Sequence, residues 1–369
     1  MSFLSLVFRN LFRQRMRTTL TVVGISVGIT IVIALGAITG GLKDTAGAMI
    51  REGGADFMVA QKGSADFSFS TVSEDEWAAV IAVPGVKRTT GVLVHITRVG
   101  SNPFFPLLGV RLDQLAAASP EVITGRLPIG ATEVILGEKA AAATGVAPGE
   151  SIEIEGRALD VVGIYRAKSV FYSGGAYAPL ATVREIARKP DVVTAVYVTA
   201  DAGVDPVELA AEIDDRLPSV TTVSSVSEYG KIDQGIEIMD ALQLAVSILA
   251  ILLGAIAVMN TMIMAVFERT REFGILRAVG WRGSRIVRLV LTEAVILCLV
   301  AAVVGIAFGL IAVQGVLQIE AIRNFLEPTY AAEVFVRGVV IAVSVGLAGA
   351  LYPAYRAVRL SPMEALRHE

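Results

Sequence analysis

The sequence predicts an α-helical membrane protein with four transmembrane helices and a mixed α+β domain between the first and second of them. Of the 369 residues, 54% are hydrophobic and only 18% are charged, and the apolar residues gather in long runs. A helix of about 20 residues crosses a hydrocarbon core of about 30 Å. The uncharged runs at 18–42, 241–267, 294–319 and 338–355 are therefore each expected to cross a bilayer.

The N-terminal segment, residues 1–17, is predicted to be a cytoplasmic amphipathic helix that lies in the headgroup region. Its arginines precede the first apolar run without an acidic partner, so the positive-inside tendency places the N-terminus in the cytoplasm. A cleaved signal peptide is the competing interpretation, because Ala46-Gly47-Ala48 offers a cleavage site. The run at 18–42 is longer than a typical signal-peptide core, which favours an uncleaved anchor.

Small residues recur along the predicted spans and let neighbouring helices approach closely. The segment from Gly24 to Gly28 also matches the G-x-S-x-G motif of hydrolases. A spanning helix cannot supply the strand and strained turn which that motif needs, so packing is the preferred interpretation. Helix packing is expected at Gly24, Gly28, Gly36, Gly40, Gly305 and Gly309.

Three residues inside the apolar runs receive structural interpretations. Asn260 and Thr261 need hydrogen-bond partners inside the bundle, and such bonds are preferred over a transport-pathway role for Asn260. Cys298 is the only cysteine, so one chain contains no disulfide and no cysteine-based zinc site. We expect Cys298 to be a small buried apolar residue.

Residues 43–240 are predicted to form a globular extracytoplasmic domain, because their apolar runs are short and charged residues are frequent. Two similar units occur within them. In the first, a helix over 73–83 precedes a strand that ends near residue 99. In the second, a helix over 205–217 precedes a strand over 220–226. This alternation suggests a small α/β or α+β subdomain assembled from two separated pieces.

Between these units, residues 109–180 are predicted to be mostly β. Residues 151–155 alternate strictly between polar and apolar, and 159–165 can return as a partner strand after a turn at Gly156-Arg157. This is the signature of a β-hairpin. A further strand is expected over 192–199.

The segment 268–293, between the second and third apolar runs, has the pattern of a docking surface. Phe273, Leu276 and Val279 fall on one helical stripe with Ile275 beside it. A following glycine can end this helix. The alternative interpretation is a basic interfacial loop that only fixes topology.

Charge places the connections on the two sides of the membrane. The segment 268–293 holds six arginines against three glutamates, whereas the short outer loop 320–337 holds two against three. The positive-inside tendency therefore places 268–293 and both termini in the cytoplasm and the inserted domain outside. In the cytoplasmic tail, residues 356–369, Ser361-Pro362-Met363-Glu364 is an N-cap signature that predicts a short helix.

Two of these segments carry a family resemblance. Glu268 to Gly280 resembles the cytoplasmic coupling loop of FtsX-like, MacB-type (type VII) ABC transporter permeases. Pro353 to Arg367 resembles the closing motif of the same domain, and Ala143 to Glu150 is also similar to that family. The motifs occur in the family's order, so the resemblance covers nearly all of the chain.

The resemblance implies a MacB-like extracytoplasmic core domain. In it, porter-like segments at 55–100 and 190–227 flank a β-rich insert at 101–189. It also implies two copies of a separate ABC ATPase and a second permease copy, as a homodimer or with a related permease. An extracytoplasmic adaptor or hydrolase is a further implied partner. The residues that would couple to the ATPase are Glu268, Arg269, Arg271, Glu272, Phe273, Ile275, Leu276, Arg277, Val279 and Gly280.

No catalytic, cofactor-binding or metal site is expected in the chain. It has no G-x-x-x-x-G-K-[ST] loop to cradle nucleotide phosphates, so ATP and Mg should bind on the partner ATPase. His95 and His368 fall on opposite sides of the membrane in this topology, and His95 is expected to be an ordinary strand residue. The acidic cluster at 74–76 is expected to open a helix rather than to bind a metal.

The leading hypothesis is a permease subunit in a prokaryotic cell (inner) membrane. It would couple ATP hydrolysis by a separate subunit to conformational change outside, for efflux or mechanotransmission. The alternative is an FtsX-like regulatory scaffold that activates an extracytoplasmic cell-wall hydrolase. A membrane-anchored enzyme is a third and weaker idea, since no catalytic constellation supports it. The net charge of −3 gives no support to nucleic-acid binding.

Overall fold

The computed structural model describes residues 15–359 except 65, 117, 119–120 and 324–325. It divides into two compact units. The helical bundle comprises Met1–Ala37, Ala241–Gly315 and Tyr330–Glu369, and the sheet domain comprises Ile38–Asp240 and Val316–Thr329. The predicted N-terminal amphipathic helix and the predicted cap at 361–364 lie largely or wholly outside the described residues.

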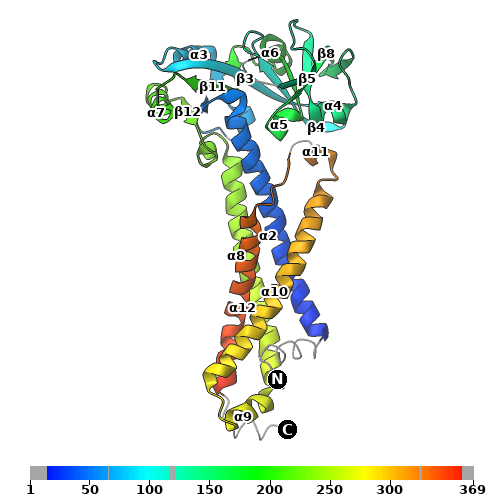
Figure 1. Ribbon diagram of the computed structural model, residues 1–369, viewed down its shortest axis with the longest axis vertical. Coiled ribbons are helices and arrows are strands. Elements are labelled where there is room, and N and C mark those ends of the chain that lie inside the picture. The colour runs from blue at the N-terminus through cyan, green and yellow to red at the C-terminus, as the bar shows by residue number, and fades with distance from the viewer. Residues whose placement is uncertain (1–14, 65, 117, 119–120, 324–325, 360–369) are drawn as a thin grey trace. The chain divides into compact units, whose positions relative to one another are not determined.

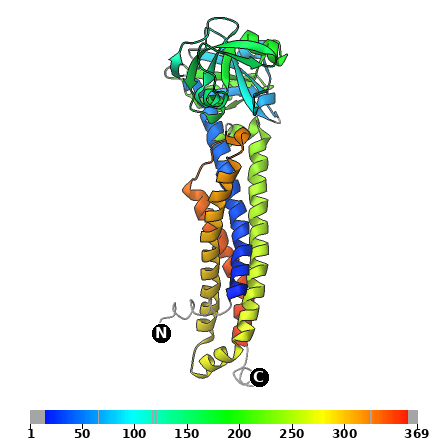
Figure 2. The ribbon, with the colours of Figure 1, turned by 90° about the vertical axis from the view of Figure 1, so that its right-hand side faces the viewer.

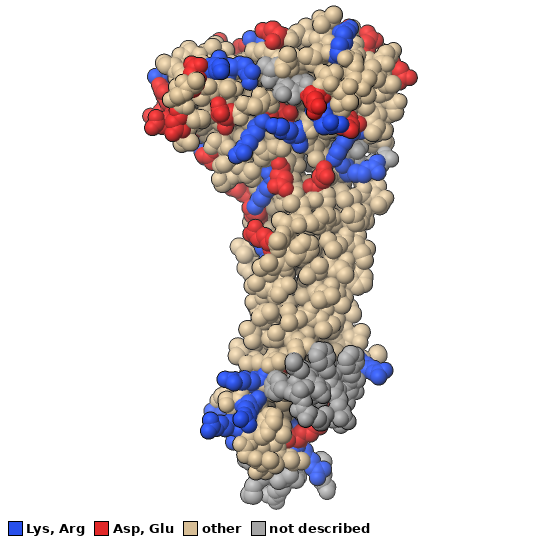
Figure 3. Space-filling view, in the orientation of Figure 1, with Lys and Arg blue, Asp and Glu red and all other residues tan. Residues whose placement is uncertain are grey.

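Four helices among the described residues are long and apolar enough to cross a membrane. They are α2 (Arg15–Ile50), α8 (Gln234–Glu268), α10 (Gly283–Val316) and α12 (Ala332–Arg359), and they lie alongside one another in both views (Figures 1 and 2). Together with the α/β domain that follows the first of them, they confirm the predicted fold class. The bundle surface in Figure 3 has a band without charged side chains.

The helices do not coincide with the predicted apolar runs. The runs at 18–42 and 241–267 lie inside longer helices, whereas α10 ends before the predicted limit at 319. α12 extends beyond 338–355 at both ends and contains Pro353. Much of the predicted loop 268–293 is also helical. Hydrophobicity predicts the part of a helix that a bilayer can bury. The helix itself can continue through polar residues, until other groups bond to its terminal N–H and C=O groups.

Close approach of glycines holds the bundle together. A Cβ at Gly305 would lie 2.8 Å from Ile29, and one at Gly309 would lie 2.9 Å from Ile33, so α10 can approach α2 this closely only without side chains. Gly24 was also expected to pack, but it is exposed and no described neighbour lies within 4 Å of its position. At the remaining predicted glycines, an added Cβ would lie within 4 Å of Ala250 (Gly28), of Gln243 and Val334 (Gly36), and of Thr329 (Gly40).

The two polar residues near the end of α8 behave differently. Thr261 Oγ1 lies 2.7 Å from Thr21 Oγ1 of α2, which confirms the expected interhelical hydrogen bond. Asn260 was expected to bond inside the bundle as well, but its side chain is exposed. Adjacent residues on a helix point about 100° apart, so one faces the core while the next faces outward.

The sheet domain contains a ten-stranded sheet in the order β12-β1-β11-β3-β4-β9-β6-β8-β5, with β7 paired to β8. A second, two-stranded sheet pairs β10 with β2. The strands of the large sheet are β1 (Phe57–Gln61), β3 (Val86–Val99), β4 (Asn102–Val110), β5 (Glu121–Gly125), β6 (Glu133–Gly137), β7 (Ser151–Ile154), β8 (Arg157–Arg166), β9 (Ala176–Pro179), β11 (Ala195–Ala200) and β12 (Val220–Val223). The small sheet comprises β2 (Val72–Ser73) and β10 (Val192–Val193).

Short helices cover the sheet. They are α3 (Glu74–Ile81), α4 (Glu138–Thr144), α5 (Val170–Ser173), α6 (Leu180–Ala187), α7 (Pro206–Arg216) and α11 (Glu320–Arg323), with the 3-10 helices η1 (Glu52–Gly54), η2 (Phe67–Phe69) and η3 (Val226–Lys231). The predicted helices at 73–83 and 205–217 correspond to α3 and α7. Ser73 and Glu76 form a capping box, so the acidic cluster opens a helix as expected.

The predicted hairpin is confirmed, because β7 pairs antiparallel with β8 across the turn at Glu155 and Gly156. The strand predicted over 192–199 is divided between β10 and β11, and the one over 220–226 ends at Val223. Single-sequence patterns locate strands better than their ends.

The two pieces of the predicted porter-like subdomain share one sheet with the residues between them. The long strand β3 pairs with β11 on one side and with β4 on the other. Both faces of this sheet are buried: Leu93 belongs to one apolar core, and Val92 and Val94 belong to the other. Successive side chains of a strand point to opposite faces, which explains this division.

Candidate coupling site

The candidate site is built on α9 (Thr270–Ala278), which joins α8 to α10 at one end of the bundle (Figure 1). Gly280 ends this helix with φ 96°. Its N–H donates to the carbonyl of Arg277 at 3.0 Å, and the N–H of Trp281 donates to the carbonyl of Leu276 at 3.0 Å. These two bonds form a Schellman motif, which requires a left-handed residue. The predicted helix stop at Gly280 is therefore confirmed.

One face of α9 packs against the chain itself. Phe273 is only 2% exposed and belongs to the apolar core of the bundle, with Leu276 packed against that core. Thr270 and Gly274 are buried as well. The predicted apolar stripe therefore does not form one free surface, because Phe273 packs inside the bundle whereas Val279 is exposed. Periodicity predicts that a face is buried but does not say what buries it.

The opposite face of α9 keeps an apolar surface. Ile275 is 48% exposed and Val279 is 77% exposed. The exposed Arg271 and Glu272 lie one turn before Ile275 on the same helix. Basic side chains gather at this end of the bundle in the view of Figure 3. An apolar pair with a charged rim is the composition of a protein contact rather than of a lipid-facing helix.

A buried ion pair anchors α9 to the bundle. Arg269 Nη1 lies 2.9 Å from the Glu293 carboxylate of α10, and its Nε lies 3.0 Å from Glu272. The guanidinium also lies 5.1 Å from the ring centre of Phe273. The side chains of Arg269 and Glu293 are only 11% and 8% exposed. Arg269 therefore positions the helix and is not a surface residue.

Two further contacts hold the segment. Arg277 Nη1 donates to the Val358 carbonyl of α12 at 2.7 Å, and Glu268 lies 3.4 Å from Arg17 of α2. Five of the ten residues predicted to couple thus contact the chain's own helices: Glu268, Arg269, Phe273, Leu276 and Arg277. Glu293 was not among the ten. The available signal was an acidic residue directly before an apolar run.

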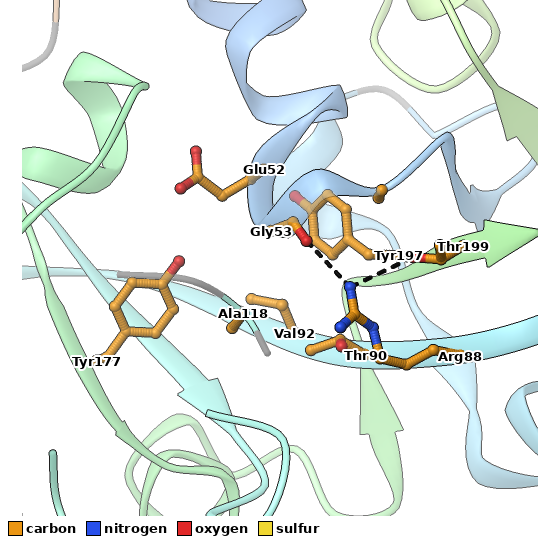
Figure 4. Close-up of a pocket in the computed structure, with 10 residues that line it drawn as sticks. Glu52, Gly53, Arg88, Thr90, Val92, Ala118, Tyr177, Tyr197 and Thr199 are labelled. Atoms are coloured by element: carbon orange, nitrogen blue, oxygen red, sulfur yellow. Dashed lines mark hydrogen bonds between the residues drawn. The ribbon is translucent and has the colours of Figure 1, made fainter. Parts of the chain in front are cut away.

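The sheet domain contains a separate buried carboxyl group. Glu52 is 6% exposed, and its Oε2 has no hydrogen-bond partner among the described residues. Figure 4 shows Glu52 with Tyr177, Tyr197 and Arg88 around a cavity, where Arg88 donates to Gly53 and Thr199. The cavity volume is about 10 Å³, which is room for about one water molecule. It is therefore too small for an organic substrate.

The described residues contain no group of three or more His, Cys, Asp or Glu side chains that could hold a metal ion. His95 lies in β3 and its Nε2 is 2.7 Å from Glu155, at the turn between β7 and β8. This contact links the hairpin to the long strand, which is a structural role.

Four apolar helices and an α/β domain after the first of them define a multi-pass membrane protein. Sequence comparison identifies its class. The MacB-like periplasmic core domain matches residues 18–216, and the FtsX-like permease C-terminal domain matches residues 244–362. The chain belongs to this family of MacB-like and FtsX-like ABC transporter permeases.

Curated relatives align over nearly the whole chain. The macrolide export ATP-binding/permease protein MacB of Hahella chejuensis is 28% identical over 391 residues, covering 96% of this chain and 58% of the relative. The pyoverdine export ATP-binding/permease protein PvdT of Pseudomonas entomophila is 27% identical, covering 99% of this chain and 59% of the relative. The chain thus spans little more than half the length of these relatives.

Two solved structures align with part of the chain at low TM-scores. The periplasmic region of MacB from Actinobacillus actinomycetemcomitans aligns with a TM-score of 0.38 and 16% identity, over 51% of this chain and 95% of that one. The extracellular domain of the noncanonic ABC-type transporter YknZ from Gram-positive bacteria aligns with a TM-score of 0.35 and 15% identity, over 46% and 99%.

Proposed function

We propose that an ABC ATPase outside these 369 residues binds this permease at α9 and that its ATP-driven movement is transmitted through this helix. The observation that carries the proposal is the exposure of Ile275 and Val279 on a helix whose other face is locked into the bundle. A partner that grips the exposed face would move a helix tied to α10 through Arg269 and to α12 through Arg277. ATP and Mg would bind on that ATPase.

Two continuous helices can carry the movement into the sheet domain. Residues 15–37 of α2 belong to the bundle and residues 38–50 belong to the sheet domain, and α8 likewise belongs to both. Lys43 and Asp240 join the two helices with an N–O distance of 2.8 Å. A continuous helix that belongs to two units is the kind of element whose shifts nucleotide binding in a partner could bias.

The assembly we propose contains two permease copies, or one copy and a related permease, with two ATPase subunits. The basic end of the bundle and both chain ends would be cytoplasmic, in a prokaryotic inner membrane, and the sheet domain would be extracytoplasmic. The relatives are named for macrolide and pyoverdine export, which supports an export role. An extracytoplasmic adaptor would then be a further partner.

The test replaces the exposed apolar pair. Ile275→Asp and Val279→Asp place a carboxylate at the proposed contact. We expect loss of co-purification with an ABC ATPase that is co-expressed with this chain and stimulated by it, together with loss of that stimulated ATP turnover. The matched control is Ile129→Asp, because Ile129 is 75% exposed in the sheet domain and distant in sequence. Wild-type association and turnover in both α9 variants would show that α9 is not the coupling site.

A further inference from the structure

The turn that follows α2 buries a carboxyl group in the sheet domain. Glu52 begins η1, just beyond the end of α2, and it is only 6% exposed. Arg88 of β3 donates from Nη2 to the carbonyl of the next residue, Gly53, at 3.2 Å. A little further on, the Asp56 N–H donates to the Val198 carbonyl of β11 at 2.9 Å. Glu52 therefore lies at the junction where α2 passes into the large sheet.

The surroundings stabilise the ionised form of this carboxyl group poorly. Its Oε2 has no hydrogen-bond partner among the described residues. The cavity beside it has a volume of about 10 Å³ and admits about one water molecule, whereas a carboxylate offers about four acceptor sites. Arg88 lines the same cavity, but its hydrogen bonds run to Gly53 and Thr199 (Figure 4). Burial without a partner favours the neutral form of a carboxylic acid.

The charged and titratable groups around Glu52 do not reverse this preference. Burial raises the pKa of four surrounding tyrosines above the usual range, so none of them supplies a charge near neutral pH. Burial also raises the pKa of Glu52 to about 7, although Lys168 and the Ser169 N–H favour its carboxylate. The surrounding groups are Arg88 of β3, Tyr165 of β8, Tyr172 of α5, Tyr177 of β9, Tyr197 of β11 and Lys168.

The protonated carboxyl group fits these surroundings better than the carboxylate does. A neutral carboxyl group carries an O–H donor, and phenol oxygens can accept from it directly or through one water molecule. Tyr177 and Tyr197 line the same cavity and carry such oxygens. Ionisation removes the donor and leaves a charge that the exposed Lys168 attracts. A carboxylate drawn toward the protein surface would pull on η1 and therefore on the end of α2.

We propose that Glu52 is a proton-binding site that couples the pH outside the cell to the junction between α2 and the sheet. With the proton bound, the carboxyl group stays in its cavity and holds η1 in place. Without the proton, the carboxylate leaves the cavity and the junction loosens. This inference goes beyond the proposed function and uses it only to place the sheet domain outside the cell.

Proton linkage gives the direction of the effect on stability. The folded protein keeps this proton up to about pH 7, whereas an unfolded chain releases it near the ordinary pKa of 4.5. Stability is therefore lost progressively as the pH rises from 4.5, and the loss levels off above about 7. Relative to Glu52→Gln, which mimics the neutral carboxyl group, the unfolding constant of the wild type should rise on the order of 100-fold over this interval.

The test follows unfolding of the full chain in mixed micelles between pH 5 and 8. A Trp281→Phe background leaves Trp77, which is 1% exposed in the sheet domain, as the only tryptophan. The stability of Glu52→Gln relative to wild type should grow as the pH rises. The control Glu208→Gln, exposed on α7, should follow the wild-type profile. A constant difference between wild type and Glu52→Gln at all pH values would overturn the proposal.

Two spectroscopic measurements separate the proton from its effect on the junction. Infrared difference spectra between pH 6 and 8 should show the loss of a protonated-carboxyl C=O band in wild type that Glu52→Gln lacks. Protection factors of the amides at 51–56 should fall over the same interval in wild type and stay constant in Glu52→Gln. Absence of the band would overturn the proton site, and constant protection factors in wild type would overturn its action on α2. None of these measurements needs an ATPase, so failure here is distinguishable from failure of coupling at α9.

Discussion

Removing the carboxylate of Glu293 isolates the contribution of the buried ion pair to the bundle. In Glu293→Gln, Arg269 keeps its charge and its place at 11% exposure but loses the ionised partner at 2.9 Å. Breaking a buried pair from one side costs about 3–5 kcal/mol, because an uncompensated charge stays behind. Glu272 still lies 3.0 Å from the same guanidinium, so we expect about 3 kcal/mol, the lower end of that range.

The assay is unfolding of the full chain in mixed micelles, followed by tryptophan fluorescence, with Glu333→Gln as the control. Glu333 is 85% exposed and lies 3.9 Å from Arg337, so its loss should change the free energy of unfolding by less than about 1 kcal/mol. The double variant Arg269→Met, Glu293→Leu removes both charges and should lose less stability than Glu293→Gln alone.

Two results would refute this reasoning. One is a Glu293→Gln variant whose free energy of unfolding lies within about 0.5 kcal/mol of wild type, which would mean that other groups compensate the charge of Arg269 without Glu293. The other is a double variant that loses at least as much as the single one, which would mean that packing and not charge dominates. If the anchor also transmits force, Glu293→Gln should keep ATPase binding at α9 while losing part of the stimulated ATP turnover.

Two further predictions concern helix packing and pH. Gly305→Ala should lower the free energy of unfolding by about 1–3 kcal/mol, because the added Cβ would lie 2.8 Å from Ile29 of α2. The control Gly24→Ala should leave the melting temperature unchanged, because nothing lies within 4 Å of its added Cβ. The side-chain hydrogen bonds from Arg126 lower the pKa of Glu133 to about 2. The carboxylate contact should therefore be intact above pH 4.5 and be lost as pH falls through about 2, while Glu133→Gln removes this dependence. Protection factors of the amides at 126–133, which correct for the intrinsic pH dependence of exchange, would stay constant between pH 2 and 5 if Glu133 stabilises nothing there.

Local chemistry explains why much of the chain was predictable. The hairpin of β7 and β8, the capped start of α3 and the stop at Gly280 each depend on a few consecutive residues. The membrane spans follow from apolar length alone, because a bilayer accepts helices that satisfy their own backbone groups. The sequence by itself therefore determined the class of the protein, its layout and the position of the helix that we propose for coupling.

Only the tertiary structure decided which faces are occupied. Phe273 and Val279 share one predicted stripe, yet the first is buried in the bundle and the second is exposed. Arg269 meets Glu293 across the turn between two helices, and Asn260 faces away from the core that holds its neighbour Thr261. A single chain's periodicity reports the direction of each side chain around its helix axis. It does not report what lies in that direction, because this depends on residues far away in the sequence.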